Sequence, residues 1–459
     1  MTKKFLSLLL AIVMICAMGA IPVSAATPTT LQEAISAAAA GATITLDKDY
    51  AENIIIEKSI TLDLNGKKIT AGADTTPAIT VKGANVVVTI TDSASAGSIE
   101  ATKHAVAIEN GASLVLESGN IVGNYGVRLL ENNVKFTMNG GTITAEDCGV
   151  FTKGNVTFVM NGGEISATTW AVAGNGLYDG STVTINGGKV VSTDYVALFH
   201  PQQGALTING GYFEGLTAVY IKSGSIKITD GEFVGKGDAE PLVTTGDGAN
   251  PTGDAVVIEQ IGGSSNYAPI EEVTISGGSF ASVKAAPVSS HKSGTATDAP
   301  IHKNFITGGK FEGEVALDTT LLPAGNDGLN TDGSPRIKYT ATFKANGETI
   351  DTVTYYSGDE VIAEPAVPAK EGYYGYWKAY ELGGNITVNA IYVKIPERSR
   401  VSFVADGKLV GIILYRANQD ELTVLPNVPA KEGYVGTWAE YTLTGKNMIV
   451  RAVYTPIAE

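Results

Sequence analysis

The sequence predicts an all-β chain that folds as a parallel β-helix followed by two smaller β-rich domains. One phrase of alternating apolar and polar residues, closed by Asn-Gly-Gly, recurs about every 22 residues. Two copies of a different unit, offset by 61 residues, fill the C-terminal third. Glycine accounts for 54 of the 459 residues and charged residues for only 17%, which is unlike the composition of a disordered chain or a coiled coil.

Residues 1–25 predict a secretory signal peptide. Lys3 and Lys4 form a short basic region, residues 5–21 are almost all apolar and uncharged, and Ala25 ends a small-residue cleavage site. The alternative is a membrane anchor, but the apolar stretch is short for a span. We therefore expect an extracellular protein, secreted or associated with the cell surface, with no membrane span after cleavage.

Removal of this leader changes the character of the chain. It takes away Cys16 and leaves Cys148 as the single cysteine, so no internal disulfide can form. It also takes away two lysines and lowers the net charge from −15 to −17. Nucleic acids and anionic membranes attract positive surfaces, so we expect no nucleic-acid partner.

The repeat in residues 26–317 has the period of a solenoid. Its clearest copies end in Asn-Gly-Gly at residues 139–141, 161–163, 186–188 and 209–211. Each copy alternates as a strand does, the Asn-Gly-Gly supplies a tight turn with positive φ, and a third apolar segment follows. Three short strands per turn, stacked at about 4.8 Å, make a parallel β-helix.

Stacking places equivalent residues of successive coils in columns. We predict that the turn asparagines hydrogen-bond to one another along the stack as a structural ladder: Asn139, Asn161, Asn186 and Asn209. The alternative is that each asparagine serves only its own turn.

The open N-terminal end of such a helix needs a cover. Residues 30–40 predict a short helix, because Thr30 and Glu33 have the spacing of a capping box. Leu31 and Ile35 share one face of this helix, which we expect to close the first coil.

The C-terminal unit reads Val-Pro-Ala-Lys-Glu-Gly-Tyr at residues 367–373 and again at 428–434. Equivalent tryptophans follow at Trp377 and Trp438, which we interpret as core residues rather than ligand platforms. The two domains are predicted at 337–395 and 399–455, after a turn-rich linker over residues 318–336.

Residues 30 to about 317 resemble the secreted right-handed parallel β-helix proteins of the pectate-lyase-like superfamily. The resemblance lies in Leu-Gln-Glu-Ala-Ile at 31–35, Ile-Thr-Leu at 44–46 and Thr-Leu-Asp-Leu-Asn-Gly at 61–66. The two C-terminal units resemble the internalin-type B repeat, a β-grasp-like module of bacterial surface proteins that serves as a spacer or attachment unit. These resemblances imply a right-handed parallel β-helix followed by two small β-grasp-like repeat domains. They leave activity open, because the superfamily includes lyases, hydrolases and adhesins without known catalysis.

Residues suited to catalysis are scarce. Arg128 is the single arginine between residues 27 and 317, and the four histidines form no metal-spaced pair. Asp147 and Asp194 each lie six residues after a turn glycine, two coils apart, at about 9.6 Å. That is the wide edge of the roughly 6.5–9.5 Å separation of inverting glycosidases, and surface turn carboxylates are the simpler interpretation. We expect no catalytic residue, metal or cofactor.

A binding surface is the better hypothesis. The seventh residue after the turn glycine is His104, Gly126, Cys148, Trp170 or Tyr195 in successive coils. Tyr125 precedes Gly126, and we expect Tyr178 and His200 in flanking loops. Aromatic rings suit sugar rings, so we hypothesise a shallow glycan groove; its lining would be Tyr125, Trp170, Tyr195, Asp147 and Asp194. Ordinary loop packing is the alternative.

The function that we expect is non-enzymatic adhesion or carbohydrate binding through the β-helix face of a bacterial surface protein. One alternative is a polysaccharide lyase or glycoside hydrolase acting on an acidic or plant-type glycan. A second is a purely structural stalk that binds no glycan. The ligand, whether a glycan or a host surface, and the oligomeric state stay open.

Overall fold

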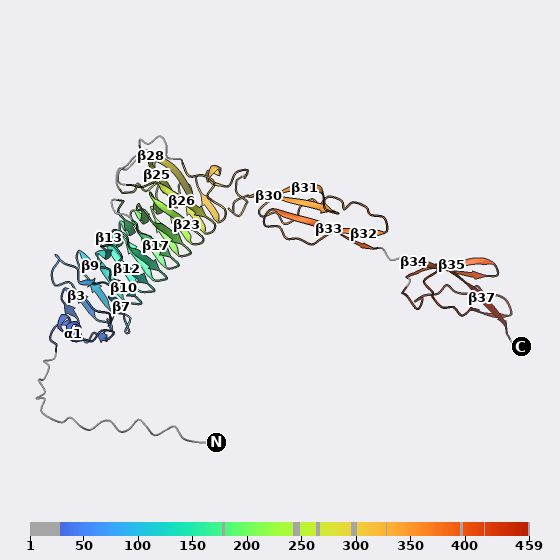
Figure 1. Cartoon of the computed structure of the whole chain (residues 1–459), viewed down its shortest axis with the longest axis horizontal. Coiled ribbons are helices and arrows are strands. Elements are labelled where there is room, and N and C mark those ends of the chain that lie inside the picture. The colour runs from blue at the N-terminus through green and yellow to red at the C-terminus, as the bar shows by residue number, and fades with distance from the viewer. Residues whose placement is uncertain are drawn as a thin grey trace, which may run out of the picture. The chain divides into compact units, whose positions relative to one another are not determined.

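The computed structural model describes residues 28–457 apart from 177–179, 242–247, 263–266, 295–300, 327, 395–397 and 417. The predicted leader and Tyr178 lie outside the described residues. The chain divides into two compact units between Ile337 and Lys338. The fold class predicted from the sequence is confirmed, because the first unit is a parallel β-helix and the second contains two small β domains (Figure 1).

The β-helix has three stacks of parallel strands, which we call faces A, B and C. Face A is a ten-stranded sheet. Its strands are β1 (Thr43–Thr45), β4 (Ile60–Asp63), β7 (Val87–Thr91), β10 (Ser113–Leu116), β12 (Lys135–Met138), β14 (Thr157–Met160), β17 (Thr182–Ile185), β20 (Ala205–Ile208), β23 (Gly224–Ile228) and β26 (Ile270–Ile275).

Faces B and C are joined, because two long strands run through the corner between them: β11 (Asn120–Leu129) and β13 (Thr142–Thr152). Face B also contains β2 (Tyr50–Ala51), β5 (Lys68–Thr70), β8 (Ser98–Glu100), β15 (Glu164–Ala167), β18 (Lys189–Ser192), β21 (Tyr212–Gly215), β24 (Glu232–Gly235), β27 (Ser279–Ser282) and β29 (Lys310–Gly313). Face C also contains β3 (Ile54–Ile56), β6 (Ile79–Lys82), β9 (His104–Glu109), β16 (Trp170–Gly174), β19 (Val196–His200), β22 (Thr217–Ile221), β25 (Val256–Gly262) and β28 (Val288–Gly294).

The core is a continuous column of inward side chains. Equivalent positions of successive coils hold similar residues, so flat rings stack on one another. Phe136 lies on Phe158 with ring centroids 5.3 Å apart and planes within 7°. A longer stack occupies the last coils of face B, with centroid separations of 4.9, 4.7 and 4.9 Å along Phe213, Phe233, Phe280 and Phe311. Stacking of this kind adds to the stabilisation that comes from burial of the apolar rings.

Helix α1 (Leu31–Ala37) covers the first coil. The Thr30 side chain accepts a hydrogen bond from the Glu33 backbone, and the Glu33 side chain accepts one from the Thr30 backbone, which completes the capping box. Leu31 and Ile35 are buried in the main core cluster. The apolar end of the stack is therefore shielded from water by the helix that the capping signal predicted.

The turn asparagines hydrogen-bond to one another along the stack. Asn161 donates from Nδ2 to Oδ1 of Asn139 over 2.8 Å, Asn186 donates to Asn161 over 2.8 Å, and Asn209 donates to Asn186 over 2.9 Å. The ladder is closed at one end by Glu117, which accepts from Asn139. These side chains are exposed, so the ladder runs along the outer edge of the turns.

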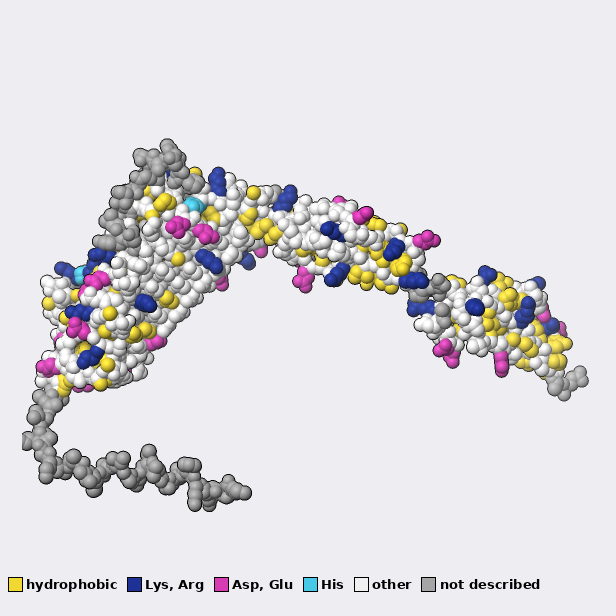
Figure 2. All heavy atoms as spheres, viewed as in Figure 1, with side chains coloured by type: hydrophobic (Ala, Val, Ile, Leu, Met, Phe, Trp, Pro, Cys, Tyr) yellow, Lys and Arg dark blue, Asp and Glu magenta, His cyan; other side chains and the backbone are white. Residues whose placement is uncertain are grey.

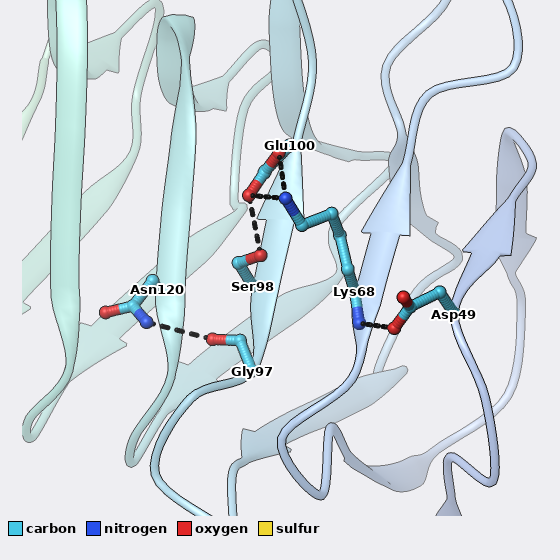
Figure 3. A network of polar contacts seen from close by, with 6 residues as sticks. All are labelled: Asp49, Lys68, Gly97, Ser98, Glu100 and Asn120. Atoms are coloured by element: carbon cyan, nitrogen blue, oxygen red, sulfur yellow. Dashed lines mark hydrogen bonds and ion pairs between the residues drawn. The ribbon is translucent and has the colours of Figure 1, made fainter.

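Polar side chains also join the first coils on the outside of face B (Figure 3). Lys68 forms an ion pair with Glu100 on the next coil at 2.8 Å. The Ser98 hydroxyl donates to Glu100, and the Asn120 amide donates to the Gly97 carbonyl over 3.0 Å. The Lys68–Glu100 and Asn120–Gly97 contacts link successive coils. The Ser98 hydroxyl orients the carboxylate that Lys68 contacts.

Each C-terminal domain is a four-stranded mixed sheet. The first has the order β31-β30-β33-β32 and the second β35-β34-β37-β36. The strands are β30 (Lys338–Ala345), β31 (Glu348–Tyr356), β32 (Tyr373–Trp377), β33 (Ile386–Lys394), β34 (Arg398–Ala405), β35 (Lys408–Arg416), β36 (Tyr434–Trp438) and β37 (Met448–Pro456). A short 3₁₀ helix, η1 (Thr319–Leu321), precedes them.

The two tryptophans occupy equivalent positions in these domains. The Trp377 indole donates to the Pro365 carbonyl over 2.7 Å, and the Trp438 indole donates to Pro426 over 2.6 Å. Each ring packs edge-on against the phenylalanine of its own core, with centroids 4.9 Å apart. The indole N–H of each tryptophan has a hydrogen-bond acceptor and its ring has an aromatic contact, as is typical of core residues.

Candidate functional site

The outer surface of face C carries a second apolar cluster, separate from the core of the β-helix. Its buried members come mainly from face C strands: Cys148, Ala173, Val196, Phe199, Tyr220, Val257 and, from a loop, Ala249. Four partly buried aromatic residues pack against them: Tyr125, Phe151, Trp170 and Tyr195. The strands beneath are thus covered on both sides, as parallel strands usually are.

A pocket of about 230 Å³ opens within this cluster. Four aromatic rings contribute to its walls, and two polar side chains lie among them. The lining includes Tyr125, Phe151, Trp170, Phe199, Asp147 and Asn175. Apolar walls with a few polar groups that fix orientation are the usual construction of a small-ligand site.

The rings of the pocket hold one another in place. Trp170 is edge-on to Tyr195 with centroids 4.6 Å apart, and it lies 4.9 Å from Phe199 at a tilt of 32°. On the other side, Tyr125 is edge-on to Phe151 at 6.1 Å. The Tyr195 hydroxyl donates to the Ala249 carbonyl, so the support behind Trp170 is itself anchored.

Asp147 is the anionic group of the pocket. It accepts a hydrogen bond from the Tyr125 hydroxyl. Burial, followed by this bond and the charge of Asp147, raises the pKa of Tyr125 above its usual range. The pocket therefore offers one phenol that is held as a hydrogen-bond donor, and the carboxyl group of Asp147 as its acceptor.

A cationic group lies beside Tyr125. The Arg128 guanidinium is 5.4 Å from the Tyr125 ring centroid, within the range of a cation–π interaction. Its Nη1 is 3.2 Å from Nε2 of His104. Desolvation, then the nearby charges of Arg128 and Lys103, lowers the pKa of His104. His104 is therefore neutral at pH 7, and its ring nitrogen can accept from Arg128.

The sequence predicted that the seventh residue after each turn glycine falls in one row, and this prediction is wrong at two coils. The strands align His104, Tyr125, Cys148, Trp170 and Val196 in one row. The corner of β11 is one residue shorter than that of β13, so Tyr125 takes the position predicted for Gly126. The corner before β19 is one residue longer, so Val196 replaces Tyr195.

The five predicted ligand residues divide into three groups. Tyr125, Asp147 and Trp170 line the pocket together. Tyr195 packs behind Trp170. Asp194 is exposed and is not among the lining residues, so the proposed Asp147–Asp194 pair does not form one site. The expectation of a loop position for His200 is wrong: this residue lies buried in β19, at a strand position that aligns with the interior core residue Ile221.

Sequence reasoning missed the outward residues Phe151, Phe199 and Tyr220. Phe151 and Tyr220 lie in the third apolar segment of their coils, and Phe199 directly follows that segment in its own coil. These residues alternate with the inward Val150, Leu198 and Val219, but both sets are apolar, so the sequence does not mark which side chains face outward. A run that is buried on both faces loses the polar alternation that marks an outer surface.

A buried ionic group adjoins the aromatic cluster at Tyr220. Lys222 and Glu259 are both fully buried and form an ion pair at 3.4 Å. Glu259 also accepts hydrogen bonds from Tyr220 and Ser293. The pair is inaccessible to solvent, so we assign it a structural role.

Among the residues that the structure describes, no three His, Cys, Asp or Glu side chains cluster as a metal site would require. Within the same part of the chain, no helix is both long and apolar enough to cross a membrane. Comparison with models of known protein families and with curated proteins finds no match.

Proposed function

We propose that this chain is a secreted bacterial surface protein that binds carbohydrate without catalysis, in the aromatic pocket on face C. The observation that carries the proposal is the joint presence of Trp170, Tyr125 and Asp147 at one pocket. A sugar ring has an apolar face that stacks on an aromatic ring and hydroxyl groups that donate to a carboxylate. These are the groups that the pocket presents.

The resemblance to secreted pectate-lyase-like proteins supports this class of ligand. In the same proposal, the two C-terminal domains act as spacer or attachment modules, by their resemblance to internalin-type B repeats. Non-enzymatic binding is favoured over hydrolysis because Asp147 has no second carboxylate among the described lining residues. Inverting and retaining glycosidases both need such a pair.

Screening the full mature chain on a glycan array tests the proposal. We expect selective binding to one group of glycans, and loss of about tenfold or more in affinity for Trp170→Ala, as for a central aromatic contact. Asp147→Asn should weaken binding, whereas Asp194→Asn is the matched control and should not. Equal affinity of the wild type and Trp170→Ala would contradict the proposal.

Two further outcomes separate the alternatives. New reducing ends or unsaturated products after incubation with pectate or related acidic glycans would favour a hydrolase or lyase. A chain that folds but binds no glycan would favour the structural stalk. Circular dichroism of each variant, compared with that of the wild type, excludes misfolding as the cause of lost binding.

A further inference from the structure

The outward sheet face of the second C-terminal domain is aliphatic and cationic. The four strands β34 to β37 contain four arginines and no acidic residue. All four arginines are exposed: Arg398, Arg400, Arg416 and Arg451. They alternate with the buried Val401, Tyr415 and Val450, so they point away from the core.

Exposed aliphatic side chains share this face with the arginines. Ile412, Leu414 and Ile449 are 50%, 57% and 60% exposed. Val435 in β36 and Val453 in β37 are 57% and 48% exposed. Leu414 is paired across the sheet with Arg400, and Ile412 and Ile449 flank Ser402 on its two sides. Figure 2 shows hydrophobic side chains with basic ones among them on the visible surface of this domain.

The fold itself does not require these residues, because the first C-terminal domain has the same sheet with polar residues at five of the positions. At the positions of Ile412, Leu414 and Ile449, the first domain has Thr352, Thr354 and Thr387. At the positions of Arg400 and Arg451 it has Thr340 and Asn389. These five residues are polar and uncharged. At these five positions the aliphatic and basic residues are therefore features of the second domain, whereas Lys338 keeps a basic residue at the position of Arg398.

The charge of the second domain is also opposite to that of the rest of the chain. Residues 398–456 contain seven basic and five acidic residues, and the whole chain has a net charge of −15. The five acidic residues lie in turns and loops: Asp406, Asp420, Glu421, Glu432 and Glu440. The sheet face is thus a local positive surface on an acidic protein, which the total charge conceals.

We propose that this face docks on a lipid surface with anionic headgroups. Arginine pairs with phosphate through two parallel hydrogen bonds, and the aliphatic side chains gain by leaving water at the acyl boundary. A glycan is disfavoured because the outward side chains of these described strands include no aromatic ring. Pairing with the same face of a second copy is disfavoured because it would bring eight guanidinium groups together without a carboxylate.

Vesicle sedimentation of the full mature chain tests this inference independently of the carbohydrate pocket. We expect binding to phosphatidylcholine vesicles that contain about one-third phosphatidylglycerol, with weaker binding as salt rises. Each arginine near such a surface contributes about fivefold, the equivalent of about 1 kcal/mol. The double variant Arg400→Thr/Arg451→Asn should therefore bind about 25-fold more weakly.

The double variant Ile412→Thr/Leu414→Thr tests the aliphatic part with residues that the first domain uses at the same positions. Val361→Thr is the control, since Val361 is 84% exposed but lies outside the strands of this face. If the variants do not fold, the reciprocal triple variant Thr340→Arg/Thr352→Ile/Thr354→Leu in the first domain should instead increase binding.

Three results would overturn the inference. They are equal binding to pure phosphatidylcholine vesicles, no binding to either vesicle, and unchanged binding of both double variants. Sedimentation velocity provides a fourth. A wild-type dimer that Ile412→Thr/Leu414→Thr converts to monomer would assign the face to a second copy of the chain instead.

Discussion

Tyr220 donates a hydrogen bond of 2.5 Å to Glu259 and so joins the aromatic cluster of face C to a buried ion pair. Its ring packs edge-on against Phe199, which in turn lies against Trp170. Burial, then the charge and hydrogen bond of Glu259, raises the pKa of Tyr220. The wall of the pocket and the buried pair are therefore one continuous packed assembly.

Breaking the buried pair should destabilise the β-helix. Glu259→Gln leaves the Lys222 ammonium buried without its counter-charge, and we expect a loss of about 3–5 kcal/mol in the free energy of unfolding. Glu164→Gln is the control, because it breaks the exposed Lys189–Glu164 pair at a cost of about 0–1 kcal/mol. Denaturant unfolding measures both. Similar losses for the two variants would show that the buried pair adds no special stability.

Acid should destabilise the fold through His200. Burial lowers the pKa of His200 to about 4, whereas an unfolded histidine has a pKa of about 6.5. The stabilising contribution is complete above pH 6.5 and declines as the pH falls towards 4, because only the unfolded chain takes up the proton. The difference between the folded and unfolded pKa values corresponds to a loss of about 3 kcal/mol in the free energy of unfolding once the pH lies below both values.

Unfolding free energies measured between pH 4 and 8 test whether acid destabilises the fold through His200. The His200→Gln variant should be less stable than the wild type at neutral pH but should show a flatter dependence on pH. An identical pH dependence in the two proteins would exclude His200 as a cause of acid sensitivity.

The second glycine of each Asn-Gly-Gly turn should resist substitution. Gly163 has a φ of +85°, and a Cβ there would lie 2.6 Å from the Gly141 carbonyl oxygen of the preceding coil. Gly41 has a similar φ of +80°, but a Cβ at that residue would meet nothing within 4 Å. Gly41→Ala should therefore cost only about 1–2 kcal/mol of backbone strain, and Gly163→Ala clearly more. Equal melting temperatures of the two variants would contradict this steric account.

The asparagine ladder should contribute modestly to stability. Asn161→Ala removes one donated and one accepted bond, and a net contribution of about 1 kcal/mol per bond predicts a loss of about 1–2 kcal/mol. Chemical denaturation measures it. A loss below about 0.3 kcal/mol would mean that water replaces the ladder fully at these exposed positions.

The sequence predicted the architecture because stacking makes it periodic. The Asn-Gly-Gly copies, the Thr30–Glu33 capping box and the duplicated C-terminal unit are local signals, and each specifies its element without information from distant residues. The pocket was harder to predict because it depends on corner lengths. A difference of a single residue at the corners of β11 and β19 exchanged Gly126 for Tyr125 and Tyr195 for Val196 in the row.

Burial on both sides of face C concealed the remaining site residues. Phe151 and Phe199 lie in apolar runs, and no polar alternation distinguishes their outward side chains from the inward ones. The loop that brings Ala249 over Tyr195 has no periodic signal at all. Site residues that a covering loop supplies cannot be predicted from a local sequence pattern, because their contacts are set by tertiary packing.

The fluorescence of Trp170 tests carbohydrate binding in the pocket most directly. The chain has three tryptophans, so Trp377→Phe/Trp438→Phe leaves Trp170 as the single indole. Titration with the glycan selected on the array should shift its emission saturably, and Tyr125→Ala should weaken the response. Glycan binding with no change in Trp170 emission would place the carbohydrate elsewhere and contradict the account.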